Sequence, residues 1–223
     1  HVIGSTLISM YTKCGIFSQA NQVFEELLIR DIVTWNALIA GHAQQGQGQE
    51  ALKCFEMMLN EGLLPDSITF ICILKACGNT RDIHKGIQIH EEIIGKGLLE
   101  KDVVLGTSLV DMYAKCGLLE KARKVLEELP IRNIVSWNAL IDGYTQQGRC
   151  NEALDCYERM QSEGLFPTAV TFICMLKAFG SKGNVDRGKQ IHEDIVSRGL
   201  LEKDIVLGTA LVDMYAKCGR PAK

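Results

Sequence analysis

The amino-acid sequence repeats itself at a fixed offset of 102 residues. Residues 103–133, VVLGTSLVDMYAKCGLLEKARKVLEELPIRN, match residues 1–31, and the same pattern begins again at residue 205. In a chain with such a period each copy buries its apolar surface against its neighbours, so stability is spread along an array. The period therefore predicts a tandem repeat architecture and argues against a single globular core.

Each period contains three segments of 31, 35 and 36 residues, which we name the short, middle and long repeats. The repeats of the first copy are 1–31, 32–66 and 67–102, and those of the second copy are 103–133, 134–168 and 169–204. A further short repeat begins at residue 205 and runs to residue 223. Since this last pattern stops part way, we expect 1–223 to be a fragment of a longer array.

Each repeat is expected to form two helices, as the middle repeat illustrates. Trp35, Leu38, Ile39 and His42 recur at helical spacing and mark one face of a first helix. A glycine-rich breaker follows at 46–48, and then comes the apolar stripe of a second helix, formed by Ala51, Leu52, Phe55, Met58 and Leu59. Strand patterns are nearly absent. The sequence predicts an all-α fold, an α-solenoid in which antiparallel helix-turn-helix pairs form a right-handed superhelix with the first helices on the concave surface.

Composition narrows the classes of function. The net charge of −3 gives no general attraction for nucleic acid, although a local groove could still be basic. No apolar run approaches the roughly 18 residues of a membrane span, so we expect no membrane association.

The nine cysteines follow the repeats more than a disulfide pattern. Seven of them occupy three repeat positions, namely Cys14, Cys116 and Cys218, then Cys54 and Cys156, then Cys72 and Cys174. No C-x-x-C is present, and no Cys and His residues stand at zinc-ligand spacing. We therefore expect small buried apolar side chains in a reducing compartment, with no metal and no cofactor.

Longer motifs point to a family. Residues 135–164 read VxWNALIxGYxQxGxxxEALxCxxxMxxEG, and residues 106–117 read GTxLVDMYAKCG. A tetratricopeptide repeat would instead show W-x₂-L-G-x₂-Y at a constant period of about 34 residues. The chain resembles pentatricopeptide repeat proteins, and more narrowly the plant PLS subfamily, in which P, L and S repeats alternate. In that resemblance the short, middle and long repeats are S, P and L repeats.

The resemblance implies a single-stranded RNA-binding module that reads one nucleotide per repeat through two or three side chains. In the family the fifth and last residues of a repeat read the base, and the second residue sandwiches it. The base-reading residues by this resemblance are Ser5 with Asp31 for G, Asn36 with Asp66 for U, Thr107 with Asn133 for A, Asn138 with Thr168 for a pyrimidine, and Thr209 for a purine. The base-sandwiching residues are Val2, Val33, Val104, Val135 and Val206.

The long repeats carry Ile71 and Ile173 at the fifth position, followed by Asp102 and Asp204 at the last. Because an apolar side chain cannot hydrogen-bond a base edge, we expect these repeats to be spacers or weak readers. The resulting footprint is 5′-G-U-N-A-Y-N-R-3′.

The chemistry of the fifth residues suits base reading. An Asn amide both donates and accepts hydrogen bonds, so it can pair with a pyrimidine edge, while the shorter Ser and Thr leave room for a purine. The alternative is that these polar residues are simply solvated, as most of their kind are. Their recurrence at the fifth position of every short and middle repeat favours a role in base reading.

Plant PLS proteins select sites for C-to-U editing of RNA in mitochondria or chloroplasts, so the resemblance implies one of these two organelles. A zinc deaminase needs H-x-E and a downstream P-C-x-x-C, and neither motif is present. His90-Glu91-Glu92 recurs as a polar helix face with no third ligand at fixed spacing. We therefore expect no catalysis and no small-molecule substrate, with the deaminase supplied elsewhere.

A second interpretation is a protein–protein interaction scaffold. In the family, the long repeats are docking sites for multiple organellar RNA editing factor (MORF) proteins, and the apolar Ile71 and Ile173 fit such a contact. A scaffold would not need matched fifth and last residues, and its binding would ignore RNA sequence.

Overall fold

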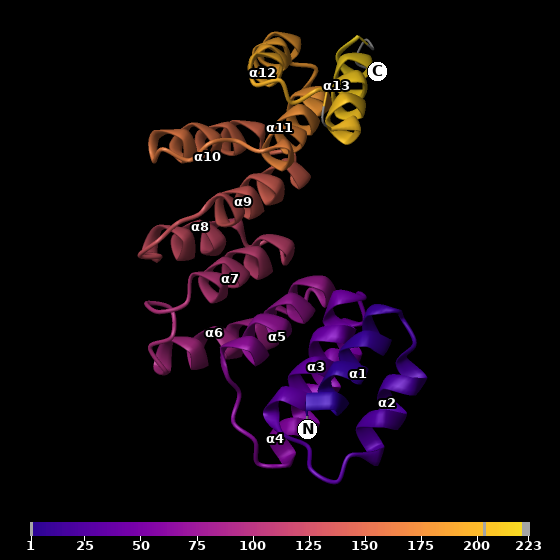
Figure 1. The fold of residues 1–223 in the computed structure, drawn as a ribbon. Helices are drawn as coiled ribbons and strands as arrows, with labels where there is room; N and C mark the ends of the chain where they lie inside the picture. The colour runs from indigo at the N-terminus through magenta and orange to yellow at the C-terminus, as the bar shows by residue number, and fades with distance from the viewer. Residues whose placement is uncertain (1, 203, 220–223) are drawn as a thin grey trace. The chain divides into compact units, whose positions relative to one another are not determined.

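A computed structural model describes residues 2–202 and 204–219, and in that part the chain forms thirteen helices and no strand (Figure 1). The helices are α1 (Val2–Lys13), α2 (Phe17–Glu26), α3 (Ile32–Gln44), α4 (Gly48–Asn60), α5 (Ser67–Thr80), α6 (Ile83–Gly95), α7 (Val103–Lys115), α8 (Leu119–Glu128), α9 (Ile134–Gln146), α10 (Cys150–Ser162), α11 (Ala169–Lys182), α12 (Val185–Ser197) and α13 (Ile205–Cys218). The predicted all-α repeat fold is confirmed. No helix of the described residues is long and apolar enough to cross a membrane.

The chain divides into two lobes. The first lobe comprises His1–Leu118 with Glu128–Pro130, and the second comprises Leu119–Glu127 with Ile131–Lys223. In the first lobe α1, α3, α5 and α7 pack on one another in sequence, and α2, α4 and α6 each pack on the first helix of their own repeat. The second lobe repeats this order, with α9, α11 and α13 as the stacked first helices and α10 and α12 as their partners.

The middle repeat shows why these segments are helical. Trp35, Leu38, Ile39 and His42 are all buried on α3, as the spacing predicts. Ala51, Leu52, Phe55 and Met58 are likewise buried on α4. Leu59 was wrongly assigned to this stripe, because its side chain is 39% exposed. Helices α3 and α5 pack against α4, and Leu59 is not among the residues of α4 that become buried.

A tryptophan in each middle repeat joins its two helices to the preceding loop. The indole Nε1–H of Trp35 donates to Glu61 Oε2 at 3.0 Å, and Glu61 also pairs with Arg30 at 3.3 Å. Trp137 donates to Glu163 in the same way, at 3.0 Å. Gly62 ends the segment at a φ of +79°, a left-handed conformation that glycine adopts without steric cost.

The first helices all begin directly after the residue that closes the previous repeat. In five of the six cases within the described residues, an Asp or Asn at that place accepts a backbone N–H of the first turn and acts as the N-cap, at Asp31, Asp66, Asp102, Asn133 and Asp204. The sixth case is Thr168, whose own N–H donates to Thr171 Oγ1 at 3.1 Å. The last residue of a repeat thus has a structural task at the start of the next one.

The nine cysteines are free thiols, but the expectation that the repeated ones are buried holds only in part. Cys14 is exposed, whereas Cys116 at the same repeat position is half-buried with its thiol 3.8 Å from the Cys77 carbonyl. Burial raises the pKa of six thiols, to about 11 for Cys54 and Cys72, to about 12 for Cys77, Cys156 and Cys174, and to a smaller extent for Cys116. A thiol with so high a pKa is a poor nucleophile and behaves as an apolar side chain.

Candidate nucleic-acid interface

A groove of about 640 Å³ runs along the first helices α1, α3 and α5 of the first lobe. It contains the fifth residues of the first two repeats, Ser5 and Asn36, together with the second residues of the next two, Val33 and Ile68. The remaining lining residues are Thr6, Ser9, Met10, Lys13, Ala37 and Ala40. Residues that lie 31 or more positions apart in the sequence therefore share one surface, because first helices stack directly on first helices.

In every repeat after the first, the second residue is an exposed apolar side chain. Val33, Val104, Val135 and Val206 are 57%, 59%, 58% and 64% exposed, whereas Val2 lies outside the residues whose side chains are described. Sequence reasoning omitted the long repeats, where Ile68 and Val170 are each 57% exposed at the same position. Both are the second residue of a long repeat, and this position in the sequence would have been enough to predict them. Within each lobe, exposed β-branched residues thus recur at the same place on successive first helices, and such a pattern indicates a contact surface.

In the first middle repeat the fifth and last residues are directly bonded. The Asn36 amide Nδ2 donates to Asp66 Oδ1 at 3.0 Å, across 30 residues of sequence. The Thr69 hydroxyl lies 2.7 Å from Asn36 Oδ1 and 2.9 Å from Asp66 Oδ1, and so bridges the two. Asn36 is only 7% exposed, so its amide orientation is fixed by these two neighbours. The three side chains form one polar cluster at the start of α5.

The second middle repeat replaces this cluster with a looser one. Thr171 Oγ1 donates to Asn138 Oδ1 at 2.8 Å, and the Thr168 hydroxyl lies 3.3 Å from the Thr171 hydroxyl. Within the described residues no direct bond joins Asn138 to Thr168, and the Asn138 Nδ2 group has no hydrogen-bond partner. The difference arises because Thr168 has no carboxylate to receive the amide.

The short repeats place their polar residues differently. Both Asp31 side-chain bonds go to Thr34, from its N–H at 2.9 Å and its hydroxyl at 2.6 Å, and these bonds lower the pKa of Asp31. Ser5 is half-buried on α1. The hydroxyls of Thr107 and Thr209 donate to backbone carbonyls of their own helices, at 2.8 and 3.0 Å.

The remaining expected positions are caps and apolar residues. Asn133 Oδ1 accepts the Ser136 N–H at 2.9 Å. Ile71 and Ile173 are half-buried, and Asp102 and Asp204 cap α7 and α13.

Lysines also lie along the first helices, and some of them form ion pairs with an aspartate one turn earlier. Lys115 pairs with Asp111 at 2.6 Å, and Lys217 pairs with Asp213 at 2.6 Å. In the first repeat Ser9 stands at the place of Asp111, so Lys13 in the groove has no carboxylate one turn before it.

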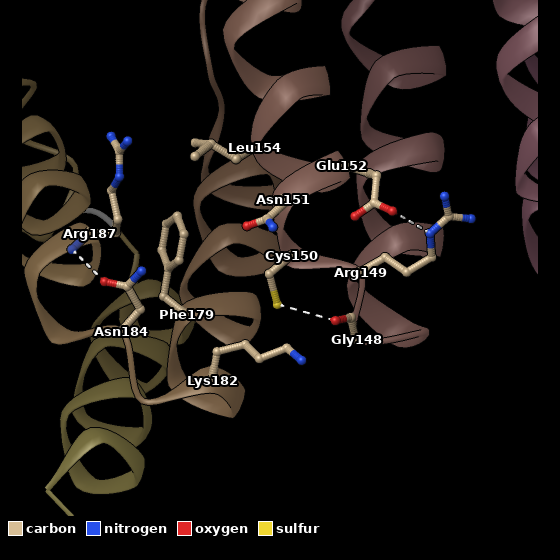
Figure 2. A pocket seen from close by; sticks show the side chains of 10 residues that line it. All are labelled: Gly148, Arg149, Cys150, Asn151, Glu152, Leu154, Phe179, Lys182, Asn184 and Arg187. Atoms are coloured by element: carbon tan, nitrogen blue, oxygen red, sulfur yellow. Dashed lines mark hydrogen bonds and ion pairs between the residues drawn. The ribbon is translucent and has the colours of Figure 1, made fainter.

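A second concavity, of about 710 Å³, lies at the turns between α10, α11 and α12 (Figure 2). Arg149 at its edge is held by Glu152 at 2.8 Å and Glu120 at 2.9 Å, and the Cys150 thiol donates to the Ala178 carbonyl at 3.2 Å. Lys182 ends α11, so this concavity lies at the opposite end of that helix from Val170. It is therefore separate from the row of second and fifth residues. No group of three His, Cys, Asp or Glu residues in the described part could hold a metal ion.

Models of a known repeat match most of the chain. The model described as PPR repeat family matches residues 30–79 and 132–181, and the PPR repeat model matches residues 5–32, 107–134 and 170–200. The chain belongs to the PPR (pentatricopeptide) repeat family.

Curated relatives agree with this assignment. A chloroplastic pentatricopeptide repeat-containing protein of Arabidopsis thaliana is 39% identical over 217 residues, which are 97% of this chain and 35% of the relative. A mitochondrial one from the same plant is also 39% identical over 217 residues, covering 97% of this chain and 21% of the relative. The chain thus spans about a third or less of the length of these two relatives.

Solved structures share the fold. The pentatricopeptide repeat protein PPR10 in complex with an 18-nt psaJ RNA element matches with a TM-score of 0.74 at 22% identity, over 85% of this chain and 29% of that one. PPR10 from maize also matches with a TM-score of 0.74, at 23% identity, over 97% of this chain and 32% of that one. Nuclear proteinaceous RNase P 2 of Arabidopsis thaliana matches with a TM-score of 0.60 at 12% identity, over 87% of this chain and 44% of that one.

Proposed function

We propose that this chain binds single-stranded RNA in a sequence-specific way along the first turns of its first helices, with one nucleotide per repeat. The observation that carries the proposal is the groove that gathers Ser5, Asn36, Val33 and Ile68 on one surface. Membership of the PPR repeat family supports it, and so does the shared fold with PPR10, which has been solved with an RNA element.

The middle repeat supports a physical route to base recognition. Val33 and Ile68 are exposed apolar residues that line the groove with Asn36, so a flat base inserted there would contact apolar side chains on its two faces. The edge of that base would meet the Asn36 amide. Within the described residues, Asp66 accepts hydrogen bonds from the Asn36 amide, the Thr69 hydroxyl and the Thr69 N–H, and all three reach its Oδ1 atom. The other carboxylate oxygen, Oδ2, is therefore available to a donor such as the N3–H of uracil. The cluster would therefore favour U.

The family resemblance supplies the other positions of the footprint 5′-G-U-N-A-Y-N-R-3′. Asn138 with Thr168 lacks the carboxylate of Asp66, which fits a pyrimidine without a strong choice between C and U. Ser5 with Asp31 would read G, Thr107 with Asn133 would read A, and Thr209 would favour a purine. Ile71 and Ile173 leave the two long repeats as spacers or weak readers.

In the cell we assign this module to the recognition step of organellar RNA editing, as a tract of the PLS type. The chloroplastic and mitochondrial names of its relatives support a location in one of these organelles. The deaminase would come from another part of a longer protein or from a partner. MORF proteins docked on the long repeats would be an added contact and would not replace RNA binding.

The test is fluorescence anisotropy with short labelled RNAs at one stated salt concentration, because phosphate contacts make affinity depend strongly on salt. One RNA contains GUAAUAA, which fits the footprint, and the other contains GGACUAA, with changes opposite Asn36 and Thr107. The proposal predicts tighter binding of the first RNA and loss of this preference in Asn36→Ala. Equal, salt-sensitive binding of both RNAs contradicts modular base reading, and binding of neither favours the scaffold interpretation.

A further inference from the structure

The two copies of the period differ on the side of the second helices, away from the groove for RNA. In the first copy a separate groove of about 360 Å³ lies between α2 and α4, above the buried side chains of α3. Its lining includes Asn21 and Glu25 of α2, His42 of α3, and Lys53, Cys54 and Met57 of α4. Four of these six residues differ in the second copy, whereas Glu25 and Cys54 are repeated as Glu127 and Cys156.

In the second copy guanidinium groups stand at the equivalent positions. Arg123 replaces Asn21, and it pairs through Nε with Glu127 at 3.3 Å and through Nη2 with Asp155 at 2.9 Å. Arg159 replaces Met57, and its Nη1 pairs with the same Glu127 at 2.9 Å. The guanidinium carbon of Arg159 also lies 5.5 Å from the centre of the Trp137 ring. Two arginines thus join α8 to α10 through carboxylates, and one of them also lies over an aromatic ring of α9.

The first copy keeps the carboxylate that accepts these bonds but has no basic residue at the places of Arg123 and Arg159. Glu25 is the counterpart of Glu127, and within the described part of the chain it has no ion pair. Lys53 stands at the place of Asp155 and is held by Glu50 at 2.7 Å. Arg30, also on the groove, is held by Glu61 at 3.3 Å. Glu25 is therefore the one carboxylate of this groove without a cation among the described residues.

We propose that the groove between α2 and α4 binds a guanidinium group, namely the arginine side chain of a protein partner. The second copy shows how this surface is completed, because Glu127 receives two guanidinium groups at the place where Glu25 receives none. An arginine suits the site better than a lysine, since its planar fork bonds a carboxylate and lies flat against side chains such as Met57 and Cys54. The site is independent of the RNA groove and of its base-reading residues.

The two tryptophans of the chain allow a direct test, because one can report binding and the other can serve as the control. They are Trp35 beneath this groove and Trp137 at the equivalent place in the second copy. Their indole N–H groups give separate NMR signals, which Trp35→Phe assigns. N-acetyl-L-arginine amide is titrated into the folded chain at low salt, with N-acetyl-L-lysine amide as the comparison. The proposal predicts a saturable shift of the Trp35 signal with the arginine probe, a weaker response to the lysine probe, and an unmoved Trp137 signal.

Two matched variants exchange the groove between the copies. Asn21→Arg with Lys53→Asp and Met57→Arg installs the second-copy pairing in the first copy, and the Trp35 response should disappear. Arg123→Asn with Asp155→Lys and Arg159→Met removes the pairing, and a response should appear at Trp137.

A triple variant that fails to fold loses its dispersed indole signals, and the single substitution Glu25→Gln then tests the proposal. Glu25 is exposed and has no ion pair among the described residues, so Glu25→Gln should abolish the shift of the Trp35 signal without unfolding the chain. No shift at Trp35, equal shifts at both tryptophans, or an unchanged response in Glu25→Gln would overturn the proposal.

Discussion

The direct bond between Asn36 and Asp66 should make Asp66→Ala far more costly than the equivalent change in the second copy, Thr168→Ala. Asp66→Ala removes the N-cap bond to the Thr69 N–H, at 2.8 Å, which is worth about 1 kcal/mol. It also leaves the Asn36 amide without its acceptor in a site where Asn36 is 7% exposed, at a further cost of about 1–3 kcal/mol. The expected loss in free energy of unfolding is about 2–4 kcal/mol.

Thr168→Ala removes a capping hydroxyl but leaves no amide newly unpaired, so its expected cost is about 1 kcal/mol. The control is Asp66→Asn, which keeps an acceptor oxygen at the cap and should cost less than about 1 kcal/mol. Urea titration followed at the Trp35 and Trp137 indole NMR signals reports each copy separately, which suits an array whose unfolding need not be a single cooperative event. Equal costs for Asp66→Ala and Thr168→Ala would refute the argument, because the bond to Asn36 would then contribute nothing.

Three further predictions follow from packing and ionisation. Glu61→Ala leaves the Trp35 indole N–H without its acceptor and should destabilise the chain by about 1–3 kcal/mol in urea unfolding. Gly41→Ala places a Cβ against the Thr12 side chain and should destabilise the chain. Gly208→Ala meets no atom within 4 Å and should stabilise α13 by up to about 1 kcal/mol. Thermal melts in which both variants shift the melting temperature in the same direction would contradict this prediction. The buried thiols have a higher pKa in the folded chain than the ordinary value of 9.0, so the unfolded chain releases their protons first. The contribution of these thiols to stability should be constant below about pH 8 and should fall as pH rises above about 9, and a melting temperature unchanged between about pH 8 and pH 10 would contradict that sign.

The sequence was sufficient to predict the helix pairs, because apolar spacing and glycine stops act locally. Trp35, Leu38 and Ile39 are buried as the spacing predicts, and α3 begins at Ile32, directly after its cap. Exposure was harder to predict, because it depends on which neighbours cover a helix. Leu59 has the right spacing but is 39% exposed, and Cys14 is exposed although Cys116 at the same repeat position is half-buried.

The candidate site could be predicted as positions but not as an arrangement. The family resemblance named Asn36 and Asp66, yet only the stacking of α3 and α5 reveals their bond and the third member, Thr69. Ile68 and Val170 were not predicted as contact residues, because the long repeats have an apolar fifth residue and were expected to be spacers or weak readers. The last residues of the repeats, such as Asp66, also cap the helices that follow them. A prediction based only on contacts with the base does not include this structural role.

The most direct test of base reading is to exchange the residues of one repeat for those of another. Asn36→Thr with Asp66→Asn gives the first middle repeat the pair found at Thr107 and Asn133. Binding is measured by competition among four RNAs that differ only at the second nucleotide of the footprint, at one salt concentration. If the fifth and last residues of a repeat read the base, the preferred second nucleotide changes from U to A while the preferences at the other positions stay the same. An unchanged preference for U in the folded variant would contradict it.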